Sequence, residues 1–118
     1  MCRLFVGADP ALWHTRTRSM RLSGVSTSLR LEDFYWTVLE EIAGRDGLSV
    51  GQLVSRLHDE LAFAGGVDNF ASFLRVCCGR YLHLQAVGAV PRDLAVPIRS
   101  LDAAAILARE AAARPVEA

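Results

Sequence analysis

The sequence predicts a mainly α-helical protein with one short N-terminal β-strand. Three observations carry this prediction: a segment with strict two-residue alternation, a pair of capped amphipathic helices directly after it, and a further helix with a long apolar face. The chain has 118 residues, of which 52% are apolar and 22% charged, and this composition fits one folded domain. Because a core of this size is marginal by surface-to-volume scaling, we expect oligomerisation.

The strand is predicted at residues 25–31, VSTSLRL. Val, Thr, Leu and Leu alternate there with Ser26, Ser28 and Arg30, so one face is apolar and the other polar. We recognise no hairpin turn with a matching run immediately beside this segment. A lone strand with an apolar face needs a partner strand, and we expect that partner to come from another chain.

Two helices are predicted after the strand. The first begins at Glu32 and Asp33, whose negative charge suits the start of a helix, and ends at Gly47, which suits a left-handed cap. The second begins at Ser49, and Gln52 three residues later completes a capping box. Apolar residues recur at helical spacing in both helices: Tyr35, Trp36, Val38, Leu39, Ile42 and Ala43 in the first, and Leu53, Val54, Leu57 and Leu61 in the second.

A third helix is predicted within residues 65–87, capped by Asp68 or Asn69. We expect it to pack on the core, because exposing its aromatic side chains would invite aggregation. Residues 88–118 are predicted to form a linker and an Ala-rich tail, and a partner protein could bind the third helix or this tail. The apolar face of the third helix comprises Phe70, Phe73, Leu74, Cys77, Tyr81 and Leu84.

Charge is unevenly distributed along the chain, although the formal net charge is zero. The first 30 residues hold five Arg against one Asp, whereas acidic residues outnumber Arg in the rest. We interpret residues 1–24 as a basic N-terminal arm that meets a polyanion. The start of the chain shows no secretory signal and no apolar run is long enough for a membrane helix, so we expect a cytoplasmic, nucleoid-associated protein without membrane contact.

The order of these elements resembles the ribbon-helix-helix family, which includes the Arc and methionine repressors. The resemblance is carried by residues 25–57, and above all by the strand-to-helix junction TSLRLEDFYW at 27–36. This junction is similar to a bacterial subfamily with the pattern T-S-[VL]-R-L-E-x-x-x-W. The resemblance implies a ribbon-helix-helix core at residues 25–64 and an intertwined homodimer, in which two chains pair their strands antiparallel into a β-ribbon, with the third helix added.

The same resemblance implies a sequence-reading protein of double-stranded DNA, and in function a transcriptional regulator. A two-stranded ribbon fits the major groove, where Ser26, Ser28 and Arg30 would face the bases. Arg30 can form a bidentate pair with guanine, worth about 1–3 kcal/mol of discrimination.

Phosphate contacts are expected from two further places. The start of the second helix offers backbone N–H groups to a phosphate, and the basic segment RTRSMR would clamp the DNA backbone. The residues in these two groups are Ser49, Val50 and Gly51, and Arg16, Arg18 and Arg21.

Two alternatives remain open from the sequence. The near-neutral charge is compatible with a protein–protein interaction module, either antitoxin-like or a dimerisation adaptor, that keeps the fold without strong DNA binding. The opening residues Met1 to Phe5 resemble class II glutamine amidotransferases, in which Cys2 would be the nucleophile, but the chain is too short for that fold.

No catalytic site, metal site or cofactor is expected. Cys77, Cys78 and His83 match no common zinc spacing, and we place Cys77 in the core. Neighbouring carboxylates such as Glu40 and Glu41 do not share a helix face, so they suit surface positions.

Overall fold

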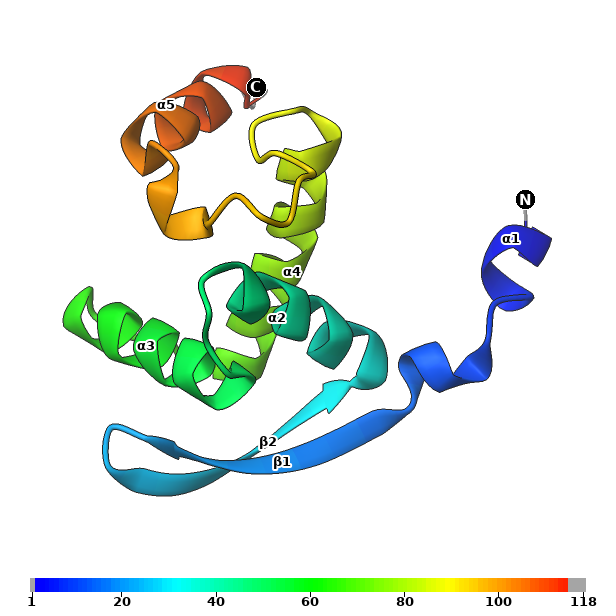
Figure 1. Cartoon of the computed structure of the whole chain (residues 1–118). Coiled ribbons are helices and arrows are strands. Elements are labelled where there is room, and N and C mark those ends of the chain that lie inside the picture. Colours follow the sequence, from blue (N-terminus) through cyan, green and yellow to red (C-terminus); the bar gives the residue numbers. More distant parts are fainter. Residues whose placement is uncertain (1, 115–118) are drawn as a thin grey trace, which may run out of the picture.

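The computed structural model describes residues 2–114. Helices α2, α3 and α4 lie on one side of a two-stranded hairpin, α5 lies beside the far end of α4, and α1 projects from the body (Figure 1). No helix in this described part is long and apolar enough to cross a membrane. The elements in chain order are α1 (Cys2–Val6), η1 (Pro10–Trp13), β1 (Thr15–Leu22), β2 (Val25–Glu32), α2 (Asp33–Arg45), α3 (Val50–Phe63), α4 (Phe70–Ala86), η2 (Ile98–Ser100) and α5 (Ala103–Ala113).

The two strands form an antiparallel hairpin within one chain, with Thr15 opposite Glu32 at one end and Leu22 opposite Val25 at the other. The prediction that the strand at 25–31 has no partner within its own chain is therefore wrong. The interpretation of residues 1–24 as a basic arm is wrong for residues 15–22, because these residues are strand β1.

A two-residue turn, Ser23-Gly24, closes the hairpin. Both residues have positive φ, 50° and 79°, which is the conformation of a type I′ turn. Ser23 is a non-glycine residue in this left-handed region, and contacts to α3 hold it there. Its hydroxyl donates to Asp59 Oδ1 at 3.0 Å and lies 3.1 Å from His58 Nδ1.

Helices α2, α3 and α4 confirm the three helices predicted from the sequence. The capping box of α3 is formed, because Ser49 Oγ accepts from the Gln52 backbone N–H at 3.1 Å and Gln52 Oε1 accepts from the Ser49 N–H at 2.9 Å. Asn69 caps α4, its side chain accepting from the Ser72 N–H at 2.9 Å. Gly47 has a φ of 68° just after α2, as expected of a left-handed cap.

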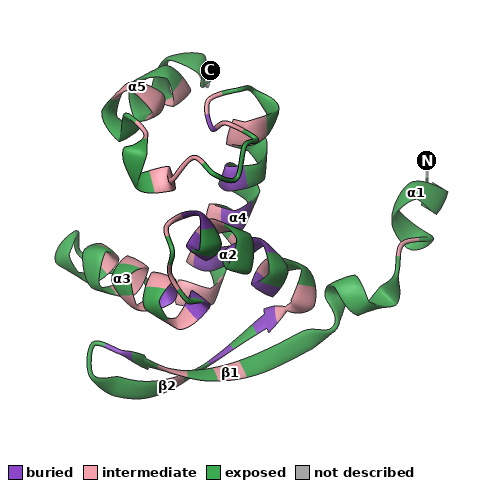
Figure 2. Ribbon diagram, in the orientation of Figure 1, coloured by how far each residue is buried: buried purple, intermediate pink, exposed green. Residues whose placement is uncertain are grey.

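The core lies between the helix-facing side of the hairpin and helices α2, α3 and α4 (Figure 2). Cys78 is fully buried there and Cys77 is only half-buried, so the placement of Cys77 in the core is a wrong prediction. Successive residues of an α-helix point about 100° apart, so the rotation of α4 about its own axis determines which of the two cysteines faces the core. Burial raises the pKa of the Cys78 thiol to about 12. The largest fully buried side chains are Trp36, Leu31, Leu39, Leu74, Val54 and Cys78.

The segment after α4 is fastened to the core by Arg45, a buried arginine of α2. Its guanidinium donates to the carbonyl oxygens of Asp93 and Val96 at 3.1 and 2.9 Å, and to the Tyr81 hydroxyl at 3.2 Å. The Tyr81 hydroxyl donates in turn to Glu41 Oε2 at 2.6 Å. The predicted linker is therefore held against α2, and the Ala-rich tail is helical over Ala103–Ala113.

The turn is tested by a Gly24→Ala variant, which we expect to lower the free energy of unfolding by about 1–2 kcal/mol. Open space surrounds a Cβ at this position, so the loss comes from the positive φ alone. Gly44→Ala is the matched control, since Gly44 is helical and equally uncrowded, and it should stabilise by roughly 0.5–1 kcal/mol. Urea unfolding measures both. Equal behaviour of the two variants would contradict a type I′ turn.

Candidate nucleic-acid interface

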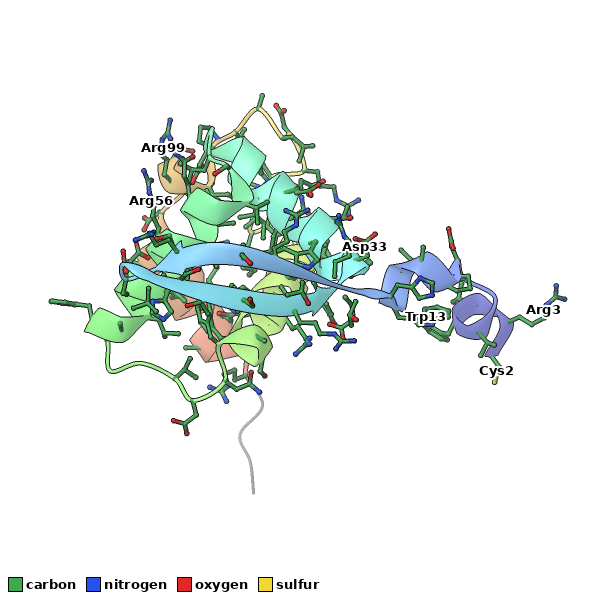
Figure 3. All side chains as sticks on the ribbon, turned by 90° about the horizontal axis from the view of Figure 1, so that it is seen from below. Cys2, Arg3, Trp13, Asp33, Arg56 and Arg99 are labelled. Atoms are coloured by element: carbon green, nitrogen blue, oxygen red, sulfur yellow. The ribbon has the colours of Figure 1, made fainter. Side chains whose placement is uncertain are left out.

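One face of the hairpin carries the predicted base-reading side chains. Cross-strand partners point to the same side of a sheet, and the register pairs Thr17 with Arg30, Ser19 with Ser28 and Arg21 with Ser26. All six residues are exposed. We call them the ribbon face. Viewed from below, the hairpin lies in front of the helices (Figure 3), so this face is directed away from the core.

The opposite face of the hairpin is buried and fixes the orientation of the ribbon. Leu22, Leu29 and Leu31 are 4%, 7% and 0% exposed and pack against the helices. Because side chains alternate along a strand, their burial forces Ser28 and Arg30 to the other side. The predicted outward placement of the β2 side chains is thus explained by the leucines beside them.

Two of the predicted phosphate-binding arginines lie on the helix-facing side. Arg16 Nε lies 2.5 Å from Asp33 Oδ1, and Arg18 Nη2 donates to Glu40 Oε1 at 2.9 Å. The Arg18 guanidinium also lies over the Trp36 ring, 4.8 Å from its centroid. The structure therefore does not bring these two arginines onto the ribbon face, and each is neutralised by a carboxylate of α2.

Arg21 and Arg30 are the cations of the ribbon face, and no acidic residue is among its six members. Arg30 Nε donates to Thr15 Oγ1 at 2.9 Å, a contact that orients the guanidinium along β1. Within residues 2–114 the terminal nitrogens of Arg30 donate to no other group, which leaves the planar fork available for a bidentate acceptor. Arg21 Nη1 donates to the Gly24 carbonyl at 3.3 Å, close to the turn.

The base of the hairpin is held in place by polar contacts from both strands. The Asp33 N–H donates to the His14 carbonyl at 2.7 Å, and Trp36 Nε1 donates to the Arg16 carbonyl at 3.0 Å. Glu32 ends β2 and accepts from Arg75 Nε of α4 at 2.8 Å. The ribbon face is therefore presented on a support that two helices fix.

The start of α3 is partly occupied by its own cap. The capping box uses the N–H groups of Ser49 and Gln52, so Val50 and Gly51 hold the remaining first-turn donors. Val50 is buried and Gly51 half-buried. Helix α3 contacts β1 on the helix-facing side of the hairpin, so these groups flank the ribbon rather than belong to its outer face.

Thr17 and Ser19 also belong to the ribbon face, and neither is among the contact residues predicted from the sequence. The Ser-Gly dipeptide between the two eight-residue strands could have predicted their position, because such dipeptides favour a hairpin turn.

Cys2, the candidate nucleophile of the amidotransferase resemblance, lies at the end of the projecting N-terminal segment, away from the ribbon (Figure 3).

Comparison with known proteins gives two matches. A family model described as Ribbon-helix-helix domain matches residues 15–82, from the first residue of β1 into α4. Among solved structures, the chain is similar to an uncharacterized protein from Bordetella pertussis Tohama I, with 52% sequence identity and a TM-score of 0.88. That similarity covers 99% of this chain and 98% of the other. No curated protein sequence matches the chain.

The stability contributed by the ion pair between Glu32 and Arg75, at the base of the hairpin, is predicted to depend on pH. The hydrogen bond from Arg75 lowers the pKa of the Glu32 carboxyl below its ordinary value of 4.5. A lowered folded-state pKa means that the stabilisation is fully present above the ordinary value and is lost as pH falls through the lowered one. We expect Arg75→Met to cost less than about 1 kcal/mol at neutral pH, because the pair is partly exposed.

The measurement is urea unfolding of the wild type and Arg75→Met across the acid range. The difference between the two proteins should vanish once Glu32 is protonated, and Glu32→Gln should remove it at neutral pH. A difference that stays constant down to the most acidic pH would contradict this assignment of the ion pair.

Proposed function

The chain belongs to the ribbon-helix-helix domain family, and on this basis we propose that it is a DNA-binding regulator that places its β-hairpin in the major groove. The observation that carries the proposal is the ribbon face. Six exposed polar side chains, two of them arginines and none acidic, lie on a two-stranded ribbon whose other face is packed on helices. The major groove accepts a ribbon of this kind.

In this proposal, the two-stranded ribbon that contacts the bases comes from a single chain. The sequence suggests a ribbon made by two chains, but β1 already occupies an edge of β2. One protomer therefore carries both strands, and the base-contacting set extends from Ser26, Ser28 and Arg30 to Thr17 and Ser19 across the hairpin.

Different residues of the interface have different roles in this proposal. Arg30 discriminates bases by a bidentate contact to guanine, and Thr15 holds its guanidinium in position. The hydroxyls of the ribbon face permit close approach and accept or donate to several bases. Arg21 and the first-turn N–H groups of Val50 and Gly51 contact phosphate, which fixes register without carrying sequence information.

A second candidate function is a protein–protein interaction module on the same fold. One observation favours it: Arg16 and Arg18 are paired with Asp33 and Glu40, so the hairpin offers DNA fewer cations than its sequence suggests. Weak, salt-insensitive DNA binding would favour this candidate over the first.

The direct test is fluorescence anisotropy with a DNA duplex selected from a random pool by the purified protein. Arg30→Ala should weaken binding by about 1–3 kcal/mol, roughly 5- to 150-fold, and relax specificity at one base position. Arg21→Ala should weaken binding to all sequences and reduce the salt slope by about 1.

Arg92→Ala is the matched control. Arg92 is an exposed arginine of the loop that follows α4, and this loop lies at the end of the molecule opposite the hairpin (Figure 1). It should leave affinity and salt slope unchanged. Equal losses for Arg30→Ala and Arg92→Ala, or a wild-type protein that selects no duplex, would overturn the proposed interface.

A further inference from the structure

A groove lies between α4 and α5, at the end of the molecule away from the hairpin (Figure 1). Its volume is about 1250 Å³, and small ligands commonly occupy clefts of roughly 300–1,000 Å³. Helix α5 has no buried residue, so the two helices do not pack closely enough to fill the space between them. The apolar part of the groove is formed by residues at helical spacing, which are Val76, Leu84 and Val87 of α4 and Ile106 and Leu107 of α5.

The basic side chains of the groove gather around a single carboxylate, that of Glu110. Arg80 of α4 binds this carboxylate by a two-point contact, at 2.5 and 3.1 Å. The hydrogen bonds from Arg80 lower the pKa of the Glu110 carboxyl, and the charges of His83 and Arg114 lower it further. Both of these basic groups therefore also lie near Glu110, from opposite walls of the groove.

Positive charge exceeds negative charge in this groove. Within residues 2–114, its lining holds the three arginines Arg80, Arg109 and Arg114 against the one carboxylate of Glu110, and His83 adds to the excess when it is protonated. Arg80 is matched by Glu110, whereas Arg109 and Arg114 form no ion pair within the same residues. The groove therefore offers two guanidinium groups to an anion that the protomer itself does not supply.

The apolar and the cationic parts of the groove follow one another along α5. Ile106 and Leu107 lie in its first half, and Arg109 and Arg114 come after them. At about 1.5 Å per residue the whole helix spans about 16 Å. An occupant that matches both parts carries an apolar chain at one end and an anionic group at the other.

We propose that the α4–α5 groove binds a fatty-acid anion, whose acyl chain lies on the apolar side chains and whose carboxylate binds Arg109 and Arg114. A guanidinium can hold a carboxylate through two parallel hydrogen bonds. The acyl chain covers Val87 and Leu107, which are 62% and 53% exposed in the protomer, and removing apolar surface from water favours binding.

Charge argues against two other occupants. A second copy of this chain would bring Arg3 with its α1, or Arg109 and Arg114 with its α5, and would add cations to a groove that already has an excess of them. Like charges at a shared interface oppose association. An uncharged apolar ligand would cover the valine and leucine side chains but would leave the two arginines without a partner.

The experiment is isothermal titration calorimetry of the full chain with dodecanoate as the probe. Two further probes separate the contributions of the chain and of the charge. Dodecyltrimethylammonium has the same chain with a cationic head, and acetate has the carboxylate without the chain. We expect dodecanoate to bind with one molecule per protomer, and we expect binding of the other two to be at least roughly 10-fold weaker.

Variants on the two parts of the groove test its assignment. Replacing both arginines, Arg109→Gln with Arg114→Gln, should weaken dodecanoate binding by roughly 10-fold or more, as for the loss of hydrogen bonds to a charged group. Leu107→Glu places a carboxylate in the path of the chain and should abolish binding. Both arginines and Leu107 are exposed, so these changes leave the core intact.

Arg92→Gln is the matched control, because Arg92 is an exposed arginine at the same end of the molecule and does not line the groove. It should bind dodecanoate like the wild type, and circular dichroism should show wild-type helix content for every variant. A wild type that does not bind dodecanoate, or that binds dodecyltrimethylammonium equally well, would overturn the proposal. Binding that survives Leu107→Glu unchanged, or that falls equally with Arg92→Gln, would place the ligand elsewhere and overturn it as well.

Discussion

The packing of the hairpin leucines against the helices is the interaction on which the rest of the structure depends. Burying Leu22, Leu29 and Leu31 contributes about 1.5–3 kcal/mol for each side chain. The ion pairs of Arg16 and Arg18 at the same junction are partly exposed and contribute less than about 1 kcal/mol each. Apolar burial therefore orients the hairpin, and every side chain at the alternate positions becomes part of the ribbon face.

An intrachain hairpin explains why the ribbon does not need a second protomer. A type I′ turn of two residues closes the strand pair at a small cost in loop entropy. Pairing the same strand with a second chain would cost about 4–15 kcal/mol of translational and rotational freedom. Formation of the two-stranded ribbon therefore requires no second protomer. Trp36 links the hairpin to the core, since its ring packs beneath the hairpin and its Nε1 donates to the Arg16 carbonyl at 3.0 Å.

Much of the fold and part of the interface could be predicted from the sequence. Residues 25–31 alternate strictly because Leu29 and Leu31 are buried beside exposed serines, and the caps at Ser49 and Asn69 mark true helix starts. Strand β1 could not be found in this way. Its helix-facing positions begin with Arg16 and Arg18, whose charged ends reach acidic residues of α2, so apolar alternation starts only at Met20.

The ion pairs could not be predicted from the sequence either, because the partners of each pair lie far apart along the chain. Arg18 and Glu40 are 22 residues apart, and sequence proximity gives no indication that they neutralise each other. The basic segment at residues 16–21 therefore predicted more positive surface than the fold presents. Arg16 and Arg18 are paired with carboxylates, and the ribbon face has Arg21 and Arg30 as its cations. The wrong placement of Cys77, rather than Cys78, in the core has a different cause, because helical periodicity defines a stripe less sharply than strand alternation defines a face.

The central claim is that one chain reads DNA with the outer face of its own hairpin. Backbone NMR of the labelled protein, titrated with a selected duplex, tests it most directly. The account predicts that the largest shift changes fall on Thr17, Ser19, Ser26, Ser28 and Arg30, with smaller ones at the start of α3. Shift changes concentrated on α4 and α5, with the hairpin signals unmoved, would contradict it.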